Sequence, residues 1–199
     1  MPITINGSGT VTGLAVGGLP DAVVDADMLA ANAVTGTKIG SAGTILSYTQ
    51  VESETDTDLG SSTSSAWADA PSPFNNLQIT PLQAGSKIKV ILNICFYQDV
   101  GDLDAGITFS HKVGSGAFTR QGPQGSADDK GLFNIYFNSP GGASDYTWPV
   151  HIDYIHTPSS YSVGDVLTYK FEYKTNKDDC HWNGIRTRLG YARLEEVNA

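Results

Sequence analysis

The strongest constraint on the fold is an alternation of apolar and polar side chains with a period of two. In the segment KIKVILNICFY, every second residue is large and apolar: Ile88, Val90, Leu92, Ile94 and Phe96. The segment LTYKFEYK repeats the pattern with Leu167, Tyr169, Phe171 and Tyr173. Successive side chains of a β-strand point to opposite faces, so this period predicts strands that bury one face. It also assigns Tyr97 to the opposite, polar face of the first segment.

Six further segments have the same character and are separated by clusters of Gly, Pro, Ser and Asp. They are TILSYTQVE, FNNLQITP, GITFSHKV, GLFNIYFN, WPVHIDYIH and RLGYARLEEV. About eight strands with turn residues between them predict an all-β fold, an antiparallel β-sandwich, of which the jelly roll is the eight-stranded version. A parallel α/β architecture would need helical segments between the strands, so the pattern excludes it.

The first 42 residues differ from the rest of the chain in composition. All 19 aromatic residues (3 Trp, 9 Tyr and 7 Phe) come after residue 43. A packed core needs large side chains, so residues 1–42 cannot form one unaided. We therefore predict an N-terminal docking arm at 1–42 and a sandwich domain at 43–199. A flexible linker is the alternative for the first part, although residues 21–34 lack its usual Ser/Gly-rich or charge-rich composition.

Within the arm, TVTGLAV predicts a short extended stretch and DADMLAANAV predicts one short helix. Asp25 is a suitable N-cap, and Asp27 lies in the first turn, where the helix dipole favours a carboxylate. Because two or three turns are marginal in isolation, we expect this helix to be covered by neighbouring copies. The residues expected between protomers are Met28, Leu29 and Val34. Those expected to dock on another protein are Ile3, Ile5, Val11, Leu14, Val16 and Leu19.

The charge balance bears on the partners of the chain. Twelve basic residues against 21 acidic ones give a net charge of -9, which disfavours binding to nucleic acid or to an anionic membrane. The N-terminus has neither the basic nor the apolar region of a secretion signal. No run of about 18 apolar residues occurs, so we expect a soluble product without a membrane span.

No motif in the sequence indicates catalysis. The nucleophile elbow, the zinc-protease helix, the P-loop and the dinucleotide fingerprint are all missing, and the acidic residues are scattered through turns. We therefore expect no enzyme activity, no cofactor and no metal. Cys95 and Cys180 are too few for a disulfide framework, and whether either pairs stays open. Cys180 stands beside His181 without the further ligands that a metal site needs.

Two other patterns have residue types that binding sites use. Asp99, Asp102 and Asp104 resemble a calcium loop, but Gly106 and Val113 occupy positions where the EF-hand pattern requires oxygen ligands. Weak calcium binding stays open as an alternative. His111, His151 and His156 lie on predicted strands, and His156 shares a face with apolar residues, which favours a place in the core or at an interface over a ligand or a catalyst.

The opening ITINGSGTVTGLAVGGLPDAVVDADMLAANAV, with TKI a few residues later, resembles the preamble of virion proteins of tailed bacteriophages, notably cyanophages. The stretches SSTSSAWADAPS, LQITPLQAGSKIKVILN and VGDVLTYKFEY are similar to the β-rich C-terminal domains of those proteins. The resemblance implies a homotrimer, an N-terminal segment that anchors to the particle or joins protomers, and an exposed C-terminal jelly roll.

Together these features predict a virion structural protein on the exterior of a phage particle, made in the host cytoplasm. An arm plus a small globule without a long shaft suits a capsid decoration (cement) protein or short head fibre that docks on the major capsid protein or another virion protein. The alternative is a tail fibre or adhesin tip, in which Trp148 and Trp182 would contact a host surface glycan. The same two residues could instead plug the sandwich ends or a subunit interface.

Overall fold

The computed structural model describes residues 4–5, 11–12, 45–59, 66–100, 103–122, 131–137, 144–175, 180–183 and 189–198. All regular elements in these ranges are β-strands, and every pairing between the strands is antiparallel. The predicted all-β class with antiparallel sheets is therefore confirmed. Within the same ranges there is no helix of the length and hydropathy needed to cross a membrane.

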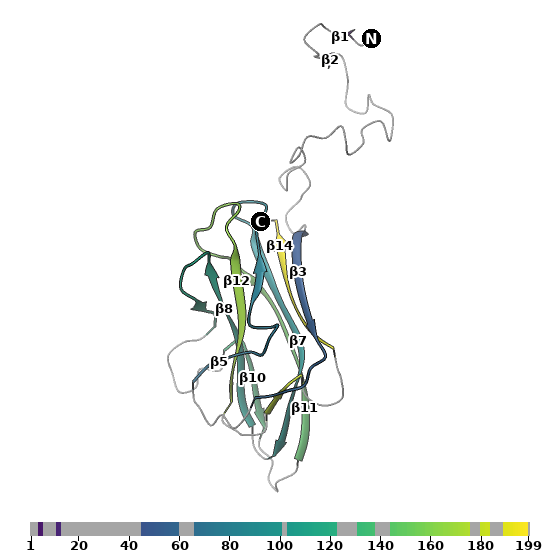
Figure 1. Cartoon of the computed structure of the whole chain (residues 1–199), viewed down its shortest axis with the longest axis vertical. Helices are drawn as coiled ribbons and strands as arrows, with labels where there is room; N and C mark the ends of the chain where they lie inside the picture. Colours follow the sequence, from purple (N-terminus) through teal and green to yellow (C-terminus); the bar gives the residue numbers. More distant parts are fainter. Residues whose placement is uncertain are drawn as a thin grey trace.

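The first large sheet is built around β7 (Lys87–Val100), and we call it the β7 sheet (Figure 1). β14 pairs with one edge of β7 and β11 with the other, while β3 pairs with the far edge of β14. The short strands β13 and β4 extend the sheet beside the end of β7. The bounds are β3 Ile45–Ser53, β4 Thr57–Asp58, β11 Ser144–His156, β13 Cys180–Trp182 and β14 Gly190–Val197.

The second large sheet is built around β8 (Leu103–Val113), and we call it the β8 sheet. β12 lies along one edge of β8, and β10 and β9 share the other. The far edge of β12 carries β5 and β6. The bounds are β5 Ala68–Asp69, β6 Leu77–Ile79, β9 Thr119–Arg120, β10 Phe133–Phe137 and β12 Leu167–Thr175.

The two sheets pack face to face around one hydrophobic core. The predicted inward faces of β7 and β12 are confirmed, because each of their nine large side chains is at most 8% exposed. Side chains of the two sheets meet directly: the ring centroids of Phe109 and Tyr154 lie 5.6 Å apart, and those of Tyr173 and Trp182 lie 6.2 Å apart. Burial of these aromatic rings contributes strongly to the favourable free energy that a sandwich needs.

The outward face of β7 differs from the prediction. The alternation assigns Tyr97 to the polar face, yet it is only 4% exposed because the ring of His181 lies against it at 5.4 Å. The strands β4, β5, β9 and β13 are absent from the predicted set, since two or three residues are too few to show a period. The segment FNNLQITP contributes only the three residues of β6.

Of the predicted arm, the structure describes residues 4–5 and 11–12. β1 (Thr4–Ile5) and β2 (Val11–Thr12) pair with each other, and β2 falls within the segment predicted to be extended. The predicted short helix lies outside the described residues.

One end of the sandwich contains the start of its first strand, β3. This strand begins at Ile45, beside Val197 at the end of β14 and close to Lys87 at the start of β7 (Figure 1). The loops 80–86 and 157–166 lie at this end, because the Tyr161 hydroxyl donates to the carbonyls of Gln83 and Ser86 at 3.1 and 2.9 Å. The loop 114–118 joins them through a hydrogen bond from Gly114 N–H to the Val166 carbonyl. We call this the Ile45 end.

Candidate functional site

The structure describes few of the residues predicted to dock or to pack between protomers. Ile5 and Val11 are partners in the β1–β2 register, which places them together on one small ribbon. The other predicted docking residues, Ile3, Leu14, Val16 and Leu19, lie outside the described residues. So do the predicted inter-protomer residues Met28, Leu29 and Val34.

The two tryptophans considered for glycan contact are not exposed at loop tips. Trp182 is 1% exposed, in β13, where its ring packs against Phe74 at 5.7 Å and against Tyr173. Trp148 is partly buried in β11 and packs against the core cluster. Glycan contact would require an exposed Trp182 ring, whereas strand β13 turns this ring between the sheets. Its position matches the alternative in which the ring fills the sandwich.

Neither the calcium pattern nor the cysteines form a described metal site. Asp102 lies outside the described residues, and Asp104 and Gly106 are part of strand β8 and not of a loop. In the described ranges no three His, Cys, Asp or Glu side chains are grouped so that they could hold a metal ion. Cys95 and Cys180 are both buried and are not joined by a disulfide.

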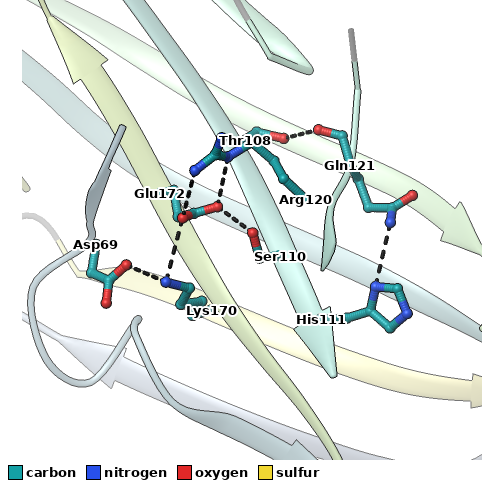
Figure 2. A network of polar contacts seen from close by, with 8 residues as sticks. All are labelled: Asp69, Thr108, Ser110, His111, Arg120, Gln121, Lys170 and Glu172. Carbon is teal, nitrogen blue, oxygen red and sulfur yellow. Dashed lines mark hydrogen bonds and ion pairs between the residues drawn. The ribbon is translucent and has the colours of Figure 1, made fainter. Parts of the chain in front are cut away.

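A charged network covers the outward face of the β8 sheet, and Figure 2 shows its members. Glu172 is only 3% exposed although it points away from the core, because Arg120 of β9 lies over it. The guanidinium donates from Nε to Oε2 and from Nη2 to Oε1, each at 3.0 Å, and Ser110 donates to the same carboxylate. Lys170 Nζ lies 3.4 Å from Oε1 of Glu172 and 2.5 Å from Oδ1 of Asp69. This network joins β5, β12, β8 and β9.

The pKa shifts in the network are explained by burial and by these partners. Burial alone would raise the pKa of Glu172, but the hydrogen bonds from Arg120 and Ser110 and the nearby positive charges outweigh it, so this pKa is lowered. Burial alone would lower the pKa of Lys170, but the hydrogen bond to Asp69 and the charge of Glu172 raise it. Both groups therefore stay ionised at neutral pH and hold each other in place.

Two aromatic rings extend the network at its margin. Arg120 stacks over Trp67, with Cζ 5.2 Å from the ring centroid. Phe118, in the loop 114–118, lies beneath both Lys112 and Lys170, whose Nζ atoms are 5.0 and 4.8 Å from its centroid. Such cation–π contacts add about 0.5–1 kcal/mol each at exposed sites. They fix the hairpin after β8 on the sheet.

A histidine pair lies between the sheets. The ring centroids of His111 and His156 are 4.1 Å apart, and His156 Nδ1 is 2.9 Å from the Tyr169 hydroxyl. Burial, and then the neighbouring His111, lowers the pKa of His156 to about 4. Burial also lowers the pKa of His111. Both rings are therefore neutral at pH 7 and behave as core side chains, as the sequence favoured for His156.

A second buried carboxylate organises the Ile45 end. Glu196 of β14 is fully buried. It pairs with Ser47 of β3 on one side and with Ile88 of β7 on the other, and Ile88 pairs in turn with His156 of β11. The carboxylate oxygens of Glu196 accept hydrogen bonds from the backbone N–H of Leu82, at 2.9 and 3.0 Å, and from the N–H of Gln83 at 2.9 Å. The Ser47 hydroxyl donates to Oε2 at 2.9 Å. Glu196 thus ties the loop 80–86 to β3, the first strand of the sandwich.

The surface of the Ile45 end is rich in apolar side chains and has few charges, among them the exposed Lys87 at the start of β7. Four large apolar side chains project there: Ile45 is 50% exposed, Leu82 60%, Val163 58% and Val166 38%. The loops 80–86, 114–118 and 157–166 together contain one charged residue, Asp165, whose carboxylate accepts a hydrogen bond from Ser162 N–H at 2.8 Å. The opposite end differs, because Glu54, Asp56 and Asp58 come after β3 there and all three are exposed. Sequence reasoning missed this surface, although the lack of charge in the three loops was visible.

No protein family model and no curated protein sequence matches this chain.

Proposed function

We propose that this chain is a virion structural protein of a tailed phage: a trimeric decoration (cement) protein or short head fibre that docks on the capsid exterior through residues 1–42. The contrast between the two parts of the chain carries the proposal. Residues 1–42 contain no aromatic residue, whereas the sandwich buries 23 residues in its own core cluster. A segment without a core is stabilised only when it is laid on another surface.

The strand order supports a jelly roll as the form of the sandwich. Numbering the principal strands β3, β6, β7, β8, β10, β11, β12 and β14 as one to eight, the β7 sheet has the order 1-8-3-6 and the β8 sheet the order 2-7-4-5. Most connections thus cross from one sheet to the other, as expected for two interleaved Greek keys. Viral capsid proteins are among the proteins that use this architecture.

The polar groups of the sandwich support a role in structure over one in catalysis. The titratable groups with shifted pKa values, such as Glu172 and His156, are buried and bonded to neighbouring side chains. Catalytic groups need to face a substrate, with pKa values matched to proton transfer. The proposed activity is therefore the burial of surface between proteins, and it requires no cofactor.

The conformational entropy that the arm loses on docking determines how much surface the contact has to bury. Each ordered residue loses roughly 1–2 kcal/mol of backbone entropy, so docking has to bury an extensive surface. A trimer helps because three arms engage together, and the effective concentration of the second and third arms is high. The arm is therefore expected to dock as a set of three.

Immunogold labelling of purified particles of the encoding phage tests the proposal. Label over the head is expected. Label confined to the tail would favour a tail fibre or adhesin, and particles without label would refute a virion role. In a second step, a chain lacking residues 1–20 is added to particles that lack the protein, with the full chain as the matched control. We expect the shortened chain to remain a folded trimer and to lose particle binding, and unchanged occupancy would refute docking through the arm.

A further inference from the structure

We infer that the Ile45 end is a self-association surface, on which the sandwich of a second copy of this chain is seated. The inference rests on the proposed function only in taking the protein to be a homo-oligomer. It goes further in naming the part of the sandwich through which the copies meet.

Charge distinguishes this end of the sandwich from the opposite end. Each copy carries a net charge of -9, so two copies repel one another through most approaches. The three loops of the Ile45 end contain only Asp165, and its carboxylate is held by Ser162 within its own loop. Lys87, which is exposed at the start of β7, is positively charged and adds no repulsion toward an acidic copy. Two copies therefore repel one another less through this end than through the opposite end, where the segment 54–58 places three negative charges.

The exposed apolar residues select the same surface. Leu82 and Val163 each expose more than half of their surface on loops that Tyr161 joins together. Exposed apolar side chains scattered singly need no explanation, but a group of them on a surface with few charges indicates a contact site. The loops are also held firmly, by Glu196 on one side and by Tyr161 on the other, so little conformational entropy is lost when a partner binds.

The position of the N-terminal segment indicates that the partner on this surface is a second copy of the chain. The 44 residues that precede β3 enter the sandwich at Ile45, which is itself one of the exposed apolar residues of the proposed contact. Copies that meet through this end bring their N-terminal segments together. Association of the sandwiches therefore raises the effective concentration of the arms for one another, and association of the arms does the same for the sandwiches. A second copy fits this arrangement because it supplies the same apolar surface with few charges and the same adjoining segment.

The test measures the mass of the full chain in solution over a range of concentrations. Leu82→Lys and Val163→Glu each place a charge on the surface without touching the core, and each is expected to weaken self-association about tenfold, the double variant about a hundredfold or more. The matched control is Tyr136→Glu on β10, which is 73% exposed away from this end and should change association less than about twofold. Circular dichroism and thermal melting verify that all variants remain folded.

Salt provides a second measurement. Screening of the net charge should strengthen association through this largely apolar surface as NaCl rises from about 50 to about 500 mM, whereas an interface built on ion pairs would weaken. The inference is overturned if the double variant keeps the mass of the wild type, if the control is affected equally, or if the wild type is monomeric at micromolar concentration. Particle labelling is independent of these results. If the label shows a virion protein and the copies associate through another surface, this inference is refuted and the proposed function stands.

Discussion

Two buried carboxylates at different places in the sandwich are stabilised in different ways. Glu172 lies on the outward face of the β8 sheet and is compensated by the charges of Arg120 and Lys170. Glu196 lies at the Ile45 end and is held by two backbone N–H groups and the Ser47 hydroxyl. The first arrangement joins strands through side chains, and the second fixes the course of a loop. The comparison shows that a buried charge can serve either purpose, depending on whether its partners belong to side chains or to the backbone.

Replacing Glu196 should have the largest effect on stability. Glu196→Ala leaves the N–H groups of Leu82 and Gln83 without their acceptor, and we expect the free energy of unfolding to fall by about 3 kcal/mol or more. The matched variant Glu196→Gln keeps one carbonyl oxygen and should lose about half as much. Urea unfolding measures both. Equal losses for the two variants would show that the charge, and not the acceptor atoms, holds the loop.

Replacing Glu172 should have a smaller effect, and one that depends on its partners. Glu172→Ala leaves Arg120 and Lys170 close together without their shared anion, which should cost about 2 kcal/mol. Arg120→Ala in the same background should then cost much less than it does alone, since the two residues act as a pair. A double-mutant cycle by urea unfolding measures this coupling, and strictly additive losses would contradict the network.

Acid should destabilise the sandwich in two successive steps. The pKa of His156 is lowered to about 4 from an unfolded value near 6.5, so the folded state binds fewer protons there and stability falls as the pH drops between these values. The pKa of Glu172 is also lowered, so its contribution is lost only at more acidic pH, below the unfolded value of 4.5.

Urea midpoints measured from pH 8 to pH 3 should fall in both ranges. A double variant, His156→Phe with Tyr169→Phe, removes the ring nitrogens together with the hydroxyl that contacts them. It should make the profile above pH 4 shallower, and the slope that remains should come from His111, whose pKa is also lowered. Retention of the wild-type slope in that variant would exclude the histidine as its cause.

The smallest effect is expected for the exposed member of the network. Asp69 has 53% of its side chain exposed and contacts Lys170, so Asp69→Asn should cost about 0.5 kcal/mol. The loss should disappear at high salt, whereas the loss caused by Glu196→Ala should not, because its partners are uncharged. Urea unfolding with and without added salt separates the two cases.

The long strands and their inward faces could be predicted from the sequence because the period of two is a local signal. Ile88 to Phe96 and Leu167 to Tyr173 show it over enough residues to identify which face is buried. The burial of Glu172 could not be predicted, since it depends on Arg120, 52 residues away in the sequence. The period of two places Glu196 on the same face as Ala192 and Leu194, but nothing in the segment RLGYARLEEV indicates that Leu82 and Gln83, more than 110 residues away, donate to it. The docking residues predicted in the arm stay predictions.

The pairing of Ile45 with Val197 has a practical consequence for labelling or display. Because the first and last long strands of the sandwich are antiparallel neighbours, the chain enters and leaves at the same side of the domain. A tag or cargo fused behind the last strand would therefore crowd the proposed meeting point of the copies. An insertion in the segment after β3, on the far side, would project away from it and leave assembly undisturbed.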